Sequence, residues 1–99
     1  MSNVTVRGTE CRVEFHKYAN GRVALELIDV DTDERYATAT INLPDVALEA
    51  GEVAIKDYSE NAGVLVALVK AGVVAPPCRN IPSGFVKAPI CRLLVPVPA

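Results

Sequence analysis

The sequence predicts one α+β domain: an antiparallel sheet of four to five strands with one main helix packed on one face. Three observations predict it. The Asn20-Gly21 pair stands between two apolar runs, which is the strongest short signal for a β-hairpin. Three segments alternate apolar and polar residues with the period of a strand. One later segment carries apolar residues at helical spacing and must bury them against the sheet.

The first three strands follow from this alternation. The first is predicted from Cys11 to Tyr18, with Cys11, Val13 and Phe15 facing the core. The second begins at Val23, after the Asn-Gly turn. The third covers Tyr36 to Leu43 and ends at Pro44, because proline cannot donate a hydrogen bond to a strand ladder.

One face of the third predicted strand is polar throughout and consists of Tyr36, Thr38, Thr40 and Asn42. Its hydroxyl and amide groups could bind a ligand. Alternatively, this is the wet side of an antiparallel strand, since such strands commonly expose one face to solvent.

The second half of the chain begins with a short strand at Val53 to Ile55 and continues into the helix, predicted from Tyr58 to Ala71. Asp57 or Ser59 can cap this helix, and Asp57 has capping-box spacing to Glu60. The predicted apolar stripe and the C′ residue that ends the helix are Leu65, Leu68, Val69, Val66 and Gly72.

The last third of the chain is rich in proline. Its composition predicts a loop from Val73 to Pro82, followed by a strand from Phe85 to Leu94. Pro89 predicts that this strand lies at a sheet edge or contains a bulge. We expect residues 1–8 and 95–99 to be mobile.

Composition and charge limit the class of protein. Ninety-nine residues, half of them apolar, form one globular domain. The net charge of −2 and the scattered Lys and Arg residues argue against direct nucleic-acid binding. The three cysteines show no CxxC spacing, which with no signal peptide favours a cytoplasmic protein. The longest apolar run, residues 62–69, is too short to span a membrane.

The chain carries no cofactor or metal motif. It has no phosphate loop, dinucleotide fingerprint or nucleophile elbow, so no cofactor is expected. The acidic turn at Asp29–Asp33 lacks the Gly and Glu that a calcium loop needs. The three cysteines and His16 lack the close spacing of zinc ligands.

The richest polar segment lies between the short strand and the helix. Lys56, Asp57, Tyr58 and Asn61 place an ammonium, a carboxylate, a phenol and an amide at this junction. Such a junction can hold a small-ligand or enzyme site on a rigid base. Equally, these short polar side chains can satisfy the free N–H groups of a first helical turn.

Four segments carry a resemblance to a known group of proteins: Tyr18–Arg22, Tyr36–Pro44, Lys56–Asn61 and Ser83–Phe85. In these segments, and over residues 11–94 as a whole, the chain resembles an uncharacterised family of small proteins carried by phages, plasmids and other mobile elements. The family has no agreed activity, so the resemblance implies no catalytic residues. It implies a role in binding, for example in blocking a host defence complex such as a CRISPR effector.

The expected function is therefore a non-catalytic interaction module, a stoichiometric inhibitor of a host protein or ribonucleoprotein complex. Tyr18, Tyr36 and Tyr58 are the expected anchors, since tyrosine offers rigid area with a polar group. Alternatively, these rings only complete the core. The expected contact surface also includes Thr38, Asn42, Lys56, Asp57 and Asn61. The protein is expected to be a monomer, or a homodimer formed by pairing of edge strands. The alternative function is a small-ligand or enzyme site at the junction.

Overall fold

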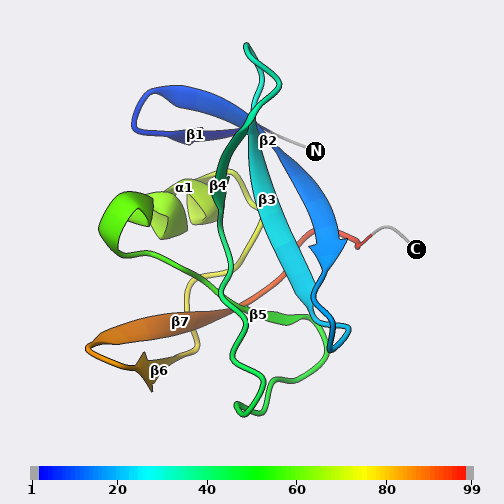
Figure 1. Cartoon of the computed structure of the whole chain (residues 1–99), viewed down its shortest axis with the longest axis vertical. Coiled ribbons are helices and arrows are strands. Elements are labelled where there is room, and N and C mark those ends of the chain that lie inside the picture. The colour runs from blue at the N-terminus through cyan, green and yellow to red at the C-terminus, as the bar shows by residue number, and fades with distance from the viewer. Residues whose placement is uncertain (1–2, 98–99) are drawn as a thin grey trace.

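A computed structural model describes residues 3–97 and contains two antiparallel sheets and one short α-helix (Figure 1). The strands in chain order are β1 (Val4–Val6), β2 (Thr9–Lys17), β3 (Val23–Asp29), β4 (Arg35–Thr38), β5 (Glu52–Ala54), β6 (Arg79–Ser83) and β7 (Val86–Arg92). A 3-10 helix, η1 (Ser59–Asn61), and the helix α1 (Val64–Lys70) lie between β5 and β6. The first sheet has the order β1-β2-β3-β4 and the second β5-β7-β6. The α+β class is confirmed in this broad sense, but the expected single sheet is two sheets and the helix is minor.

The β2–β3 hairpin forms as predicted, with Lys17 opposite Val23 at its closed end. The Tyr18 N–H donates to the Arg22 carbonyl over 2.8 Å and closes the turn. Gly21 takes a positive φ of 83°, whereas Asn20 contributes through its side-chain oxygen, which accepts the Arg22 N–H. Glycine therefore supplies the backbone conformation of the turn and asparagine supplies a hydrogen bond.

The main core lies between the first sheet, β5 and α1. The predicted inward side chains Cys11 and Val13 are buried, and Phe15 packs against them half-buried. Leu25 and Leu27 of β3 are completely buried beside them. The other buried residues of this core are Val4, Val6, Ala39, Val53, Ile55, Val64, Ala67, Leu68, Val73, Val74 and Cys91.

The N-terminal part of the chain contributes to this core. Residues 1–2 and 98–99, which fall in the segments expected to be mobile, lie outside the described residues. From residue 3 on, the chain enters β1, which pairs with β2 and packs against α1. Val4 and Val6 are 0% and 1% exposed. We predicted no strand before Cys11, because three residues are too few for period-two alternation to stand out.

The third predicted strand is shorter than expected. Regular pairing with β3 ends at Thr38, and a register shift at Leu27/Ile28 interrupts it. The chain then crosses to the second sheet, where Thr40 pairs with Ile55. Thr40 is only 3% exposed, so the polar face is not wet throughout. The prediction failed here because the segment pairs with β3 up to Thr38 and then, at Thr40, with Ile55 instead.

The predicted helix from Tyr58 to Ala71 is wrong in its first half. The chain forms η1, leaves helical geometry at Ala62 (ψ 127°), and turns through Gly63 with φ 99° before α1 begins. Val64, Ala67 and Leu68 are its buried residues. Val66 was predicted in the apolar stripe, but it lies off the face formed by Val64, Ala67 and Leu68 and is 65% exposed. Gly72 (φ 76°) follows the helix as the predicted C′ glycine.

The second sheet corrects two predictions that rested on proline. The expected loop up to Pro82 contains β6, an edge strand, where a missing N–H costs no ladder bond. Pro89 lies in β7, which is the central strand rather than an edge. There its carbonyl accepts the Ile55 N–H, one residue beyond the end of β5. Its nitrogen points to that same side, where regular pairing with β5 has already stopped.

Candidate functional site

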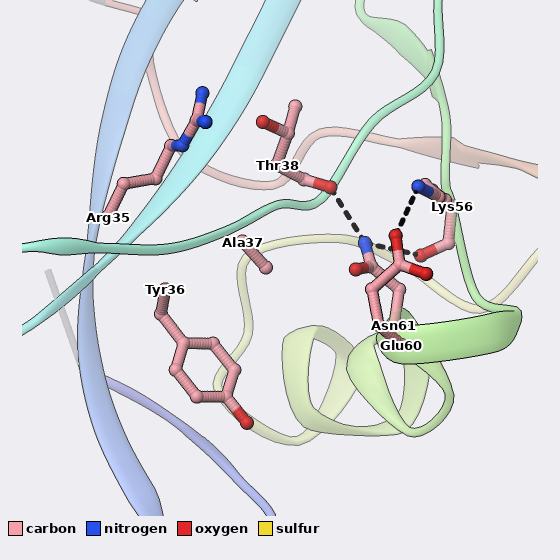
Figure 2. Close-up of a pocket in the computed structure, with 7 residues that line it drawn as sticks. All are labelled: Arg35, Tyr36, Ala37, Thr38, Lys56, Glu60 and Asn61. Atoms are coloured by element: carbon pink, nitrogen blue, oxygen red, sulfur yellow. Dashed lines mark hydrogen bonds and ion pairs between the residues drawn. The ribbon is translucent and has the colours of Figure 1, made fainter.

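A cleft of about 390 Å³ lies along the edge of β4, between this strand and the junction that leads from β5 into η1. Four consecutive residues, Arg35 to Thr38, line one side. Lys56, Glu60 and Asn61 line the other (Figure 2). The cleft thus brings together four of the predicted contact residues: Tyr36, Thr38, Lys56 and Asn61.

Asn61 ties the two walls of the cleft together. Its side-chain nitrogen donates to the Thr38 carbonyl at 2.7 Å and to the Lys56 carbonyl at 3.2 Å. Both acceptors are backbone oxygens, which fixes the orientation of the amide. The residue is only 2% exposed, yet within residues 3–97 no hydrogen bond is found to its side-chain oxygen. Figure 2 shows this oxygen turned away from both carbonyls, on the side of Ala37 and Tyr36.

An exposed ion pair forms the rim opposite β4. The Lys56 ammonium lies 2.6 Å from the Glu60 carboxylate, and the Glu60 side chain is 68% exposed. The Glu60 hydrogen bond raises the pKa of Lys56, and the Lys56 hydrogen bond lowers the pKa of Glu60. Both groups are therefore charged at neutral pH. Arg7, which is outside the cleft lining, donates to the Glu60 carbonyl.

The remaining junction residues have structural roles. One carboxylate oxygen of Asp57 accepts the backbone N–H groups of Gly63 (3.1 Å) and Leu65 (3.0 Å). Asp57 thus caps α1, as one of the two interpretations predicted, but across an intervening 3-10 turn. The capping box with Glu60 does not form, because Glu60 pairs with Lys56. Tyr58 is half-buried, with the Lys56 ammonium 5.7 Å from its ring centroid.

Tyr18 and Asn42 lie outside the cleft lining. The Tyr18 hydroxyl shares a 2.9 Å hydrogen bond with the Thr40 hydroxyl, and Asn42 accepts from the Asn20 side chain at 3.1 Å. Tyr36 lines the cleft while its ring packs against the core. Of the three tyrosines expected as anchors, Tyr36 lines the cleft, whereas Tyr18 and Tyr58 lie outside its lining.

Three cleft residues were missed by the sequence reasoning: Ala37 and the two charged residues Glu60 and Arg35. Glu60 stands four residues after Lys56, a spacing at which opposite charges meet on a helical turn. Arg35 opens β4 and is exposed, and no ion pair with it occurs within the described part of the chain. No sequence signal marks Arg35, because the cleft depends on how β4 meets a segment about twenty residues later.

The other chemically reactive side chains lie away from the cleft. Burial raises the pKa of the Cys11 thiol, and raises that of Cys91 to about 11. His16 is exposed on β2 and lies 3.2 Å from Glu14. Over residues 3–97, no three His, Cys, Asp or Glu side chains are grouped to hold a metal ion.

Outside the cleft, the carboxylate of Glu52 forms an ion pair with Arg79. The Glu52 side chain is 2% exposed and accepts both guanidinium nitrogens of Arg79, at 2.9 and 3.2 Å. The Glu49 N–H adds a third hydrogen bond. These bonds, with Arg79 first, lower the pKa of Glu52 to about 2. Arg79 also donates to the Ala47 carbonyl and so fastens the loop before β5 to β6.

The comparisons with known proteins leave the family open. No family model matches the chain, and neither curated proteins nor solved structures gave a match. The resemblance to mobile-element proteins therefore stays a prediction. In the described part of the chain, no helix has the length and apolar character needed to cross a membrane.

Proposed function

We propose that the protein is a non-catalytic binding module whose recognition surface is the cleft between β4 and the β5–η1 junction. The observation that carries this proposal is the Asn61 amide. Its two N–H groups are held by backbone carbonyls, and its oxygen faces the cleft as a fixed hydrogen-bond acceptor. An accessible, oriented acceptor on a buried residue, beside an exposed cation, can recognise a partner, because it selects one that donates a hydrogen bond and carries negative charge.

The protonation states of the reactive groups support binding over catalysis. The Lys56 ammonium is held protonated by Glu60, so it is a poor base. The buried Cys11 and Cys91 thiols have raised pKa values and so are poor nucleophiles. The Asp57 carboxylate is occupied by the first turn of α1.

The resemblance to proteins of mobile elements narrows this proposal to a stoichiometric inhibitor of a bacterial defence complex. Such an inhibitor acts by occupying a surface that its target needs. The partner in this narrower hypothesis is a host protein or a ribonucleoprotein complex, and the resemblance alone supports it.

Affinity capture from a bacterial lysate, followed by mass spectrometry, tests the proposal with one matched pair of variants. Arg35→Glu reverses the charge on the cleft rim, and Arg92→Glu reverses another exposed arginine, on β7 and outside the cleft. We expect a complex at fixed stoichiometry that is lost with Arg35→Glu and kept with Arg92→Glu. Equal capture by both variants would show that the cleft is not the recognition surface.

The alternative, a small-ligand or enzyme site, uses the same cleft and needs its own test. Thermal-shift screening against nucleotides and metabolites gives no response if the partner is a macromolecule. A shift of several degrees with one compound, abolished by Arg35→Glu, would favour the alternative. Turnover of that compound by the purified protein would end the non-catalytic proposal.

A further inference from the structure

The cleft follows the backbone edge of β4 rather than one of its faces. Neighbouring side chains of a strand point to opposite faces, yet Arg35, Tyr36, Ala37 and Thr38 all line the cleft. β4 is the last strand of its sheet, so this edge has no neighbouring strand in the sheet. Whatever fills the cleft therefore lies beside the backbone of β4.

The pairing of β4 with β3 shows which backbone groups face the cleft. The Ala39 N–H donates to the Leu25 carbonyl, and the register places Thr38 opposite Glu26. Adjacent residues of a strand direct their N–H and C=O groups to opposite sides, so those of Thr38 point away from β3. The Thr38 carbonyl accepting from Asn61 agrees with this direction.

The Thr38 N–H and the Asn61 side-chain oxygen then offer one donor and one acceptor at the same wall of the cleft. This is the complement of a peptide group, which presents one C=O and one N–H. The register shift next to Ala37 limits regular pairing to this end of β4. A strand added here is therefore short and depends on side-chain contacts as well.

Those contacts favour negative charge. Arg35 stands on the rim, where no carboxylate within residues 3–97 is in ion-pair distance of it. Lys56 uses one of its three N–H groups for Glu60. The lining thus holds two cations and one carboxylate.

From these observations we infer that the cleft binds an extended, acidic segment of a partner protein, which adds as a short strand beside Thr38. The inference rests on the proposed function and names the chemistry of its partner. The segment accepts from the Thr38 N–H, donates to the Asn61 oxygen, and places a carboxylate against Arg35.

The test is an NMR titration of the full chain at low salt with a capped eight-residue peptide in which Glu alternates with Thr. The same peptide with Gln in place of Glu is the control ligand. We expect the largest shifts at the Thr38 amide and the Asn61 side-chain amide, with a dissociation constant below about 1 mM. Arg35→Gln should weaken binding roughly tenfold, because a charge-assisted hydrogen bond is lost. Arg92→Gln should leave it unchanged.

Three results would overturn the inference. The Gln peptide could bind as tightly as the Glu peptide, or a single capped glutamate could bind as tightly as the octapeptide. The shifts could also map away from β4. If the octapeptide fails while Arg35→Glu still abolishes lysate capture, the strand inference is wrong and the proposed function stands. If both experiments fail, the cleft is not a recognition surface.

Discussion

Two of the ion pairs in this protein, Arg79–Glu52 and Lys56–Glu60, differ in how much water reaches the carboxylate. In the Arg79–Glu52 pair the glutamate side chain is 2% exposed, and in the Lys56–Glu60 pair it is 68% exposed. The Glu52 carboxylate accepts two hydrogen bonds from Arg79 and one from the Glu49 N–H, and the Cys78 thiol also donates to it. The Glu60 carboxylate accepts one, from Lys56. The comparison shows that a cation–carboxylate pair can fasten the fold where the carboxylate is buried, and can leave charge accessible to a partner where the carboxylate is exposed.

Removing the buried carboxylate should have the largest effect on stability. Glu52→Gln removes a carboxylate that is shielded from water and accepts hydrogen bonds from both guanidinium nitrogens of Arg79, whose own side chain is 38% exposed. We expect the Tm to fall by roughly 15 °C, measured by circular dichroism at neutral pH. Glu49→Gln is the control, since this exposed neighbour meets Glu52 through its backbone N–H. Equal melting of Glu52→Gln and the parent would mean that the pair contributes nothing.

Acid should remove the same contribution without a mutation. Mainly through the Arg79 hydrogen bond, the pKa of Glu52 falls from 4.5 to about 2 on folding. The unfolded chain therefore binds this proton more tightly than the folded protein does. The stabilisation that ionised Glu52 gives to the folded protein is complete above about pH 4.5 and is lost as the pH falls toward about 2. The Tm difference between the parent and Glu52→Gln should shrink over this window. A constant difference would show that charge is not its source.

The buried amide of the cleft should come next. Asn61→Ala removes the donors to the Thr38 and Lys56 carbonyls and opens the contact between β4 and η1. We expect a loss of about 2 kcal/mol in the free energy of unfolding, measured with urea, because two hydrogen bonds are lost and the two backbone carbonyls are left without these donors. Asn42→Ala is the matched control, since this amide has one exposed bond, to Asn20. An equal loss in both variants would argue against the clamp.

The sequence predicted best those features that depend on neighbours in the chain. The β2–β3 hairpin and the Gly72 helix end follow from residues within one turn of each other. Asp57 was found as a cap, although it acts six and eight residues ahead. The positions of Pro82 and Pro89 were misjudged, because local preference does not tell which side of a strand lacks a partner.

The cleft was predicted in part for the same reason. Lys56 and Asn61 were identified from their polar neighbours, and Tyr36 and Thr38 from the alternation of their strand. These two groups meet through contacts between distant segments: the Asn61 side chain donates to the Thr38 carbonyl 23 positions away, and the Lys56 N–H donates to the Ala39 carbonyl. Arg35 becomes part of the site through such long-range contacts, which no local pattern encodes.

The exposed pair should have the smallest effect on stability and a visible effect on binding. Glu60→Gln removes a carboxylate that is mostly in water, so the Tm should change by no more than about 2 °C. It also frees the Lys56 ammonium, which should tighten binding of the Glu-containing octapeptide by about threefold at low salt. Raising the salt to about 0.5 M should cancel this gain, since screening weakens exposed charges. A large fall in Tm would instead place Glu60 with Glu52 among the residues that hold the fold, and the contrast between the two pairs would disappear.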